Sequence, residues 1–232
     1  MKTKVALVTG SNKGIGKAIA ARLEQSGMTV IRNGLTDNPN RKQLYIKADV
    51  GTDWGRRKLE GYVLTKYGQL DVLINNAAYT ELIEHSNLSG LTEIIFDRMY
   101  DVNLKGPLLL IRHLHSMLID SDSPNIINIA SVAGITANGS NIAYCALKAG
   151  LINMTKSLAR CLAPIRVNAI SPGLIDTTFV DWSDEVISDT ISKTPIDRIG
   201  EPDDIAQAVM SVLDMKYLTG QDIIVDGGRT LN

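Results

Sequence analysis

Short apolar runs alternate with helical patterns along the 232 residues of the chain. The runs are rich in β-branched residues and apolar at successive positions, which indicates parallel strands covered on both faces. They lie at Val5–Thr9, Thr29–Ile31, Leu44–Ile46, Val72–Asn75, Ile126–Ala130, Arg166–Ile170 and Ile223–Val225. Helical spacing predicts helices over Gly16–Ser26, Arg56–Tyr67, Glu93–Leu118, Tyr144–Leu162 and Asp203–Leu213. The alternation predicts an α/β fold: one doubly wound domain over residues 1–232, with about seven parallel strands and helices on both faces.

One connection between predicted strands is unusually short. Only twelve residues separate Ile31 from Leu44, and Pro39 is among them. A crossover between parallel strands needs roughly a dozen residues at minimum. We therefore expect no full helix there, and at most a turn.

The first strand ends in a glycine-rich turn, "TGSNKGIGKAIA". Gly10, Gly14 and Gly16 permit a tight turn, a close approach of the backbone to a pyrophosphate, and close packing of helix on strand. The helix that follows offers unpaired N–H groups and the positive end of its dipole. Because the glycines follow a strand and open a helix, they predict a dinucleotide site of the Rossmann type rather than a plain turn.

The second strand bears on the choice of cofactor. An NAD site usually has an acidic residue here, accepting the ribose hydroxyls. This strand instead continues into Arg32 and Asn33, the nearest acid is Asp37, and Lys13 lies inside the glycine turn. Two cations and no acid favour a 2′-phosphate, so we expect NADP, with NAD as the alternative. If Lys13 and Arg32 are only solvated surface charges, this argument fails.

Composition and charge exclude several function classes. Apolar residues make up 44% and charged residues 21%, with a formal net charge of −1, so we expect no nucleic-acid or membrane partner. The two cysteines and three histidines show no metal-ligand spacing, and we expect no metal site. We find no stretch of about 18 apolar residues and no long apolar signal segment. A cytoplasmic location is the default expectation.

Three residues could form a catalytic group. Tyr144 and Lys148 are four residues apart in "YCALK", which places them on one face of a helix. Ser131 follows the apolar run "NIINIA", and the carboxyl ends of strands are where open α/β sheets bind ligands. A tyrosine hydroxyl can give a proton to a carbonyl oxygen, and a nearby ammonium group lowers its pKa. The serine hydroxyl can hold the substrate oxygen.

With these motifs, the chain resembles the short-chain dehydrogenase/reductase family over essentially its whole length. "TGSNKGIG", Asp49–Val50, "NNAA", Asn103 in "DVNLKG", Ser131, Tyr144 and Lys148, "SPG" and "VDGG" occur in the order of the family. Ser131 and Tyr144 are thirteen residues apart, as in that family. The departures are small: Ala78 replaces a usual glycine, and Cys145, read as a packed thiol, replaces a usual small residue.

The resemblance implies a role for each motif. Tyr144 is the acid/base and Ser131 positions the carbonyl. Lys148 binds the nicotinamide ribose and lowers the pKa of Tyr144, and Asn103 anchors a water that links the lysine to solvent. The implied cofactor contacts are Gly10, Ser11, Asn12, Lys13, Gly14, Ile15, Gly16, Arg32, Asn33, Asp49, Val50, Asn75, Asn76, Ala77, Tyr144, Lys148, Pro172, Gly173, Ile175 and Thr177.

The substrate is less constrained. In the family, the region around residues 177–200 is a mobile lid; its apolar residues Phe179, Val180, Trp182, Val186, Ile187 and Ile191 suggest a moderately hydrophobic substrate, unless they simply pack on the core. The members most like this chain are 3-oxoacyl-carrier reductases, whose acidic carrier needs a basic entrance. Here "LIDSDSPN" has Asp120 and Asp122, and the turn "LAPIRVN" is short. We therefore expect a free small ketone or alcohol, with a carrier-bound 3-oxoacyl substrate as a close second.

Two other functions compete with ketone reduction. Dehydration or epimerisation of a nucleotide sugar would need a substrate domain, and few residues follow Gly173. A non-catalytic dinucleotide sensor would be expected to lack Tyr144 or Lys148, and both are present. The resemblance also implies a homotetramer, or a dimer, with contacts through the long helical segments and through "VDGGRTLN". If those helices are only buried within the subunit, the tetramer rests on resemblance alone.

Overall fold

The computed structural model of the protein describes residues 3–37 and 44–231. Seven parallel strands form one sheet in the order β3-β2-β1-β4-β5-β6-β7. The predicted fold class and all seven predicted strands are confirmed, although β2 continues three residues further than its apolar run. The strands are β1 (Val5–Val8), β2 (Thr29–Gly34), β3 (Tyr45–Lys47), β4 (Val72–Asn75), β5 (Asn125–Ile129), β6 (Arg166–Pro172) and β7 (Asp222–Val225).

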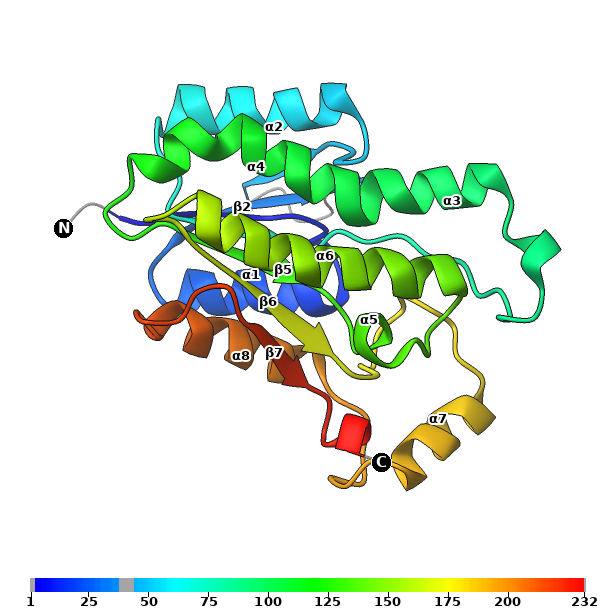
Figure 1. Ribbon diagram of the computed structural model, residues 1–232. Coiled ribbons are helices and arrows are strands. Elements are labelled where there is room, and N and C mark those ends of the chain that lie inside the picture. Colours follow the sequence, from blue (N-terminus) through cyan, green and yellow to red (C-terminus); the bar gives the residue numbers. More distant parts are fainter. Residues whose placement is uncertain (1–2, 38–43, 232) are drawn as a thin grey trace.

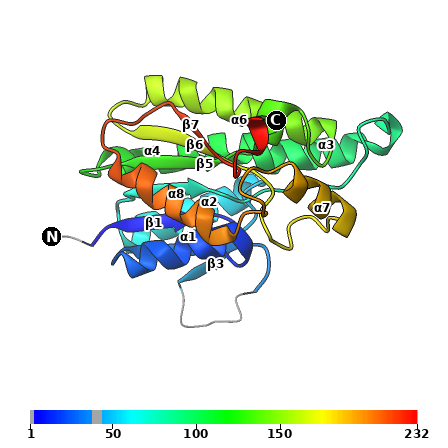
Figure 2. The same cartoon turned by 90° about the horizontal axis from the view of Figure 1, so that it is seen from below.

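Helices cover both faces of the sheet (Figures 1 and 2). On one face lie α1 (Gly14–Gln25) and α8 (Pro202–Asp214), packed against each other. On the other face lie α2 (Asp53–Lys66), α4 (Gly106–Ile119) and α6 (Ile142–Cys161). The shorter elements are a 3₁₀ turn at Leu88–Gly90, α3 (Glu93–Tyr100), α5 (Ala133–Thr136), α7 (Asp184–Ser192) and a 3₁₀ turn at Arg229–Leu231.

The alternation of side chains along each strand explains why the strands are apolar throughout. Val5 and Leu7 of β1 belong to the core cluster under α2 and α4, whereas Ala6 and Val8 belong to the cluster under α1 and α8. Successive side chains of a strand point to opposite faces, and here both faces are covered. A continuous apolar run is therefore the expected pattern for a central strand of this sheet.

The helix predicted over Glu93–Leu118 is interrupted, which corrects that prediction. Between α3 and α4 the chain forms a π-helical turn at Asp101–Lys105, in which the Gly106 N–H donates to the Asp101 carbonyl five residues back. Pro107 follows, and because proline has no N–H it cannot donate to the Asn103 carbonyl as a continuous α-helix would require. Such turns inside helices frequently mark functional sites.

The short β2–β3 connection is described only in part. Residues 35–37 and 44 contain no helix, and residues 38–43, including Pro39, lie outside the described residues. The prediction of no full helix therefore stays a prediction for that segment.

The carboxyl ends of the strands meet at one edge of the sheet. There the chain leaves β1, β4 and β5 at Gly10, Asn76 and Ser131, and strand order reverses between β1 and β4. Open α/β sheets bind their ligands at such a reversal. The fold therefore positions the glycine turn and the candidate catalytic group along one crevice.

Candidate active site

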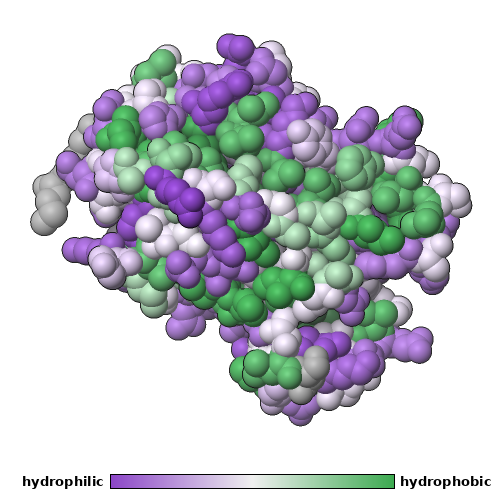
Figure 3. Space-filling view, in the orientation of Figure 1, coloured by the Kyte–Doolittle hydropathy of each residue, from purple (hydrophilic) through white to green (hydrophobic). Residues whose placement is uncertain are grey.

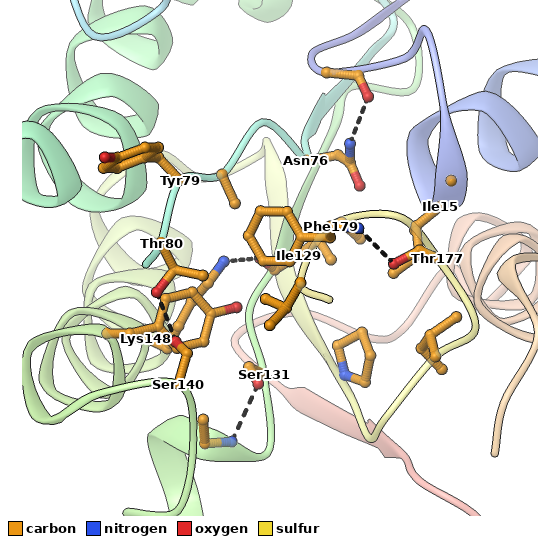
Figure 4. Close-up of a pocket in the computed structure, with 18 of the residues that line it drawn as sticks. Ile15, Asn76, Tyr79, Thr80, Ile129, Ser131, Ser140, Lys148, Thr177 and Phe179 are labelled. Carbon is orange, nitrogen blue, oxygen red and sulfur yellow. Dashed lines mark hydrogen bonds between the residues drawn. The ribbon is translucent and has the colours of Figure 1, made fainter. Parts of the chain in front are cut away.

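A cavity of about 1150 Å³ opens along this edge of the sheet. Figure 4 shows Ile15, Asn76 and Thr177 at one end, and Thr80, Ser131, Ser140 and Lys148 gathered at the other. Most residues expected at the site line this cavity. They are Gly10, Asn12, Lys13, Gly14, Ile15, Gly16, Asn33, Asp49, Val50, Asn76, Ala77, Ser131, Tyr144, Lys148, Pro172, Gly173, Ile175 and Thr177.

The glycine turn has the geometry of a phosphate cradle. Gly10 and Gly14 have φ angles of 63° and 52°, in the left-handed region that favours glycine. A methyl group on Gly16 would collide with the Gly10 carbonyl and with the Asn76 side chain. Lys13 precedes α1 without a side-chain cap, so the first-turn N–H groups of the helix face the cavity uncapped. These features fit a pyrophosphate, and through it a dinucleotide cofactor.

The adenosine end of the cavity contains no acidic residue after β2. Gly34, Leu35 and Thr36 line it there, and none can accept a hydrogen bond from ribose with a carboxylate. Asp49, which follows the neighbouring strand β3, also lines the cavity, and its carboxylate forms an ion pair of 2.9 Å with Arg98 of α3. The cavity therefore lacks a carboxylate at the end of β2, the position typical of NAD sites.

The structure corrects the expected role of Arg32. Its side chain is only 4% exposed and does not line the cavity. The guanidinium group donates two hydrogen bonds of 2.9 Å to Glu24 of α1 and a weaker one to the Ser11 carbonyl. Arg32 lies on β2 one residue before Asn33, so its side chain points to the α1 face rather than along the crevice. The argument for a 2′-phosphate therefore depends on Lys13 and on the missing acid.

Ser131, Tyr144 and Lys148 come together as the sequence predicts. Ser131 follows β5, and the hydroxyl of Tyr144 forms a hydrogen bond with it. Lys148 is one helical turn further along α6; its Nζ lies 5.6 Å from the centre of the Tyr144 ring and donates to the Ile129 carbonyl at 2.8 Å. Two elements, the end of β5 and the first turns of α6, thus hold a hydroxyl pair and an amine at one point.

Burial dominates the titration of both α6 groups. It raises the pKa of Tyr144 above its ordinary value, and the hydrogen bond with Ser131 opposes this only in part. It lowers the pKa of Lys148 to about 7. Desolvation disfavours the charged form of each group, so both side chains favour their neutral forms. The expected lowering of the tyrosine pKa by the lysine is therefore not the dominant effect in this structure.

Four expected site residues do not line the cavity; their side chains instead form hydrogen bonds with the segments around it. Ser11 Oγ accepts from the Asn33 N–H at 2.9 Å, which joins the glycine turn to β2. Asn75 Nδ2 donates to the Asn128 side chain across β4 and β5. The buried Asn103 side chain accepts from the Tyr79 N–H at 2.9 Å and donates to the Tyr79 carbonyl at 2.7 Å. Arg32 is the fourth.

Residues of the region expected to form a lid line the cavity. The Phe179 ring lies against Tyr144, with ring centres 6.4 Å apart, and Lys13 Nζ donates to the Thr178 carbonyl at 3.2 Å. Of the apolar lid residues, Phe179, Val180, Trp182 and Val186 line the cavity, whereas Ile187 and Ile191 do not. The polar residues Glu185, Asp189 and Thr190 of α7 also line it. The lid is therefore less uniformly apolar than its sequence indicates.

Sequence reasoning missed a polar group near the catalytic residues. Thr80 follows β4 and Ser140 precedes α6, and both line the cavity. Arg229 and Thr230 reach it from the end of the chain. No motif marks Thr80 or Ser140, whereas Arg229 and Thr230 directly follow the "VDGG" motif, which the sequence analysis assigned to an interface.

The acidic residues taken to surround the entrance lie elsewhere, which corrects that inference. Asp120 ends α4, and Asp122 lies between α4 and the start of β5. The turn "LAPIRVN" likewise leads into the start of β6. Both segments are at the amino edge of the parallel sheet, opposite the cavity, and neither lines it. In this subunit their charge gives no argument against an acidic carrier.

Metal ligation and membrane insertion were also tested on the described residues. Within them, no three His, Cys, Asp or Glu side chains are grouped so as to hold a metal ion. Over the same residues, no helix is both long and apolar enough to span a bilayer.

Comparison with known proteins gives matches over nearly the whole chain. The family model described as enoyl-(acyl carrier protein) reductase matches residues 10–230. The chain is 34% identical to 3-oxoacyl-[acyl-carrier-protein] reductase FabG of Thermotoga maritima, covering 100% of this chain and 99% of that protein. It is 35% identical to FabG of Staphylococcus aureus, covering 97% and 98%.

Solved structures give the same picture. A Burkholderia xenovorans protein assigned to the short-chain dehydrogenases/reductases superposes with a TM-score of 0.90 at 32% identity, covering all of both chains. Aldohexose dehydrogenase of Thermoplasma acidophilum superposes with a TM-score of 0.91 at 30% identity, covering 100% of this chain and 95% of the other. Because each match covers nearly all of both chains, the similarity extends over the whole domain and is not limited to a shared motif.

Proposed function

Since the chain belongs to the short-chain dehydrogenase/reductase family and is an oxidoreductase acting on the CH–OH/ketone pair with NAD(P), we propose that it is an NADP(H)-dependent enzyme with Tyr144 as its general acid/base. The observation that carries this proposal is the meeting of Ser131, Tyr144 and Lys148 at one end of a cavity whose other end is a phosphate cradle. A bound nicotinamide supplies or accepts the hydride.

The proton is handled by the chain's own residues. In the direction of reduction, the hydroxyls of Tyr144 and Ser131 hold the carbonyl oxygen, and Tyr144 gives it a proton. Burial keeps the pKa of Tyr144 high, so its hydroxyl is protonated and ready to donate. Lys148, with a pKa of about 7, is charged in a fraction of molecules near neutral pH, and that charge stabilises the phenolate left behind. The lid excludes water from this exchange.

The choice of NADP rests on the adenosine end of the cavity. The described residues that line the cavity at the end of β2 carry no carboxylate, since Asp37 lies outside it and pairs with Lys47 at 3.1 Å. Lys13 is the cation of the glycine turn that lines the cavity. Its present partner, the Thr178 carbonyl, is neutral, so a phosphate dianion is the stronger acceptor. Asn12 and Thr36, joined by a hydrogen bond of 2.9 Å, border the same place.

The substrate of this proposal is a small free ketone or secondary alcohol. A 3-oxoacyl group on a carrier protein is the second candidate, favoured by the names of the bacterial relatives. The aldohexose dehydrogenase among the structural neighbours shows that the same fold also takes free polar substrates. Asp120 and Asp122 no longer count against the carrier, because they lie at the far edge of the sheet.

A second copy of the chain is proposed to pack on the face formed by α3, α4 and α6, giving a dimer or tetramer. Figure 3 shows apolar side chains spread over this face. Ile94 is 82% exposed, and Phe96, Tyr100, Leu108 and Ile142 are also exposed. Exposed apolar groups in this number favour an interface. The molar mass in solution tests this.

Turnover tests the proposed function. Wild type should oxidise NADPH in the presence of a ketone, followed as loss of cofactor absorbance. Tyr144→Phe should lower kcat/KM by about 10²–10⁴-fold, because it removes only the proton donor. Tyr217→Phe, at a fully exposed tyrosine, is the matched control and should keep wild-type rates. A Tyr144→Phe enzyme as active as wild type contradicts the mechanism.

A further inference from the structure

Two hydroxyls face the cavity beside the catalytic group and have no part in the proton transfer described above. The Oγ atoms of Thr80 and Ser140 lie 2.6 Å apart, and both residues line the cavity. Figure 4 draws this pair in the same part of the cavity as Ser131 and Lys148. Ser140 is 3% exposed, so its hydroxyl is screened from bulk water.

The buried side chain of Asn141 sets the direction of these hydrogen bonds. Its Oδ1 accepts from the Tyr144 N–H at 2.8 Å as the N-cap of α6, which identifies the oxygen end of the amide. Its Nδ2 therefore supplies two hydrogens, one to the Glu81 carbonyl at 2.8 Å and one to Thr80 Oγ1 at 3.1 Å. Thr80 Oγ1 is thus an acceptor on that side.

The remaining hydrogen of Thr80 goes to Ser140. Two other acceptors compete for it: the Glu81 carbonyl at 3.4 Å, beyond the usual range for hydroxyl hydrogen bonds, and Met99 Sδ at 3.8 Å, a weak acceptor. Ser140 Oγ, at 2.6 Å, is the nearest and strongest acceptor. Ser140 then accepts, and its own hydrogen has no further partner among the described residues. The hydrogen bonds run in one direction, from Asn141 to Thr80 and from Thr80 to Ser140, so each bond polarises the next donor. It ends in a spare O–H at the cavity.

We propose that Ser140 donates this hydrogen bond to a second oxygen of the substrate, next to the reacting carbonyl. The substrate class is therefore an oxygen-substituted ketone, such as a 3-oxo ester, a 3-oxo thioester or a hydroxyketone, rather than a hydrocarbon ketone. This inference rests on the proposed function and refines its substrate. Because Asn141 bonds to Thr80 and to the Tyr144 backbone, the donor and the acid/base belong to one rigid unit.

Selectivity follows from the unpaired donor. A ketone without a second oxygen displaces water from Ser140 and leaves its hydrogen without an acceptor in a buried place. Sites built to bind a particular polar group discriminate strongly against analogues that lack it. An oxygen-substituted ketone should therefore have a kcat/KM at least about tenfold above that of a hydrocarbon ketone of equal length.

The experiment measures the ratio of kcat/KM for ethyl 3-oxobutanoate to that for 2-hexanone, with NADPH. Ser140→Ala and Thr80→Val should each lower this ratio about tenfold or more, mainly through KM for the oxo ester. Thr80→Ser keeps the relay and should keep the ratio. Ser89→Ala, an exposed serine outside the cavity, is the matched control. Melting temperatures show whether each variant is folded.

Each outcome decides one question. A wild-type ratio near one, or equal losses on both ketones in folded Ser140→Ala, overturns the role of Ser140 while the reductase function stands. If neither ketone nor any other on a panel is reduced, the proposed function fails. The role of Ser140 is then read separately from binding of pentane-2,4-dione by calorimetry, which should weaken in Ser140→Ala. Unchanged binding overturns it.

Discussion

The contacts of Arg32 indicate that it stabilises the fold and does not bind the cofactor. Replacing it distinguishes these two roles. We predict that Arg32→Met destabilises the protein and leaves its preference for NADPH over NADH unchanged. The reason is geometric: the guanidinium group is directed to Glu24 on α1 and does not line the cavity. Lys13→Met should show the opposite pattern, with the NADPH preference reduced about tenfold and stability nearly unchanged.

The expected loss of stability follows from the contacts. Arg32 makes two charge-assisted hydrogen bonds of 2.9 Å to Glu24 and a third, at 3.3 Å, to the Ser11 carbonyl. Charge-assisted bonds contribute about 1.5–3 kcal/mol each, but the Glu24 side chain is 38% exposed and regains water when its partner is lost. The net loss should therefore be about 1–3 kcal/mol, or a fall in Tm of about 2–12 °C.

Urea unfolding and steady-state kinetics with both cofactors provide the assay. Glu24→Gln and the double variant complete a mutant cycle, in which the coupling between the two side chains should account for most of the loss. The reasoning is refuted if Arg32→Met unfolds at the wild-type urea concentration while its selectivity for NADPH collapses.

Three further perturbations test other parts of the structure. Gly16→Ala should lower cofactor affinity at least about tenfold, measured by fluorescence titration, because its methyl group collides with the Gly10 carbonyl; wild-type affinity would contradict the cradle. Asn103→Ala should cost about 2–4 kcal/mol in urea unfolding, because it leaves the Tyr79 N–H and carbonyl unpaired, and a loss below about 0.5 kcal/mol would refute this. Burial lowers the pKa of Lys148 to about 7, so between about pH 7 and 10 the unfolded chain binds more protons there than the folded one, and stability gains up to about 1.4 kcal/mol per pH unit from this group. Comparing urea unfolding of wild type and Lys148→Met at pH 7, 8 and 9 isolates this rise, which the variant should lack.

The fold was predictable because its signals are local and repeated. Each buried strand is a continuous apolar run, and the turn from Gly10 to Gly16 needs glycine for steric reasons that sequence shows directly. Tyr144 and Lys148 were predictable together because helical spacing fixes their common face. The π-helical turn was not predicted, although Pro107 after it is visible in the sequence; the pairing of Asn103 in this turn with the Tyr79 backbone, 24 residues away, is visible only in the structure.

The direction of a side chain was the weakest inference. Arg32 follows two apolar residues at the end of β2, and its sequence position is equally compatible with either face of the sheet. Its partner Glu24 lies on the preceding helix, and no motif marks that pair. The acidic residues Asp120 and Asp122 were misplaced for a related reason: sequence distance from β5 does not tell which edge of the sheet a loop occupies. Hydroxyl pairs such as Thr80 and Ser140, from segments 60 residues apart, are likewise visible only in three dimensions.

The contact of the lid with the glycine turn has a consequence for the order of events in a catalytic cycle. Lys13 holds the Thr178 carbonyl, and the neighbouring Thr177 lies within 3.2 Å of the place a methyl group on Gly14 would take. The same strip of chain therefore lies over the entry of the dinucleotide and, through Phe179, beside Tyr144. If a dinucleotide binds beneath this strip, it can leave only after the strip has lifted, so we predict an ordered sequence of binding, dinucleotide first and carbonyl second. We further predict that release of the oxidised dinucleotide limits turnover, so rapid-mixing traces of ketone reduction should begin with a burst.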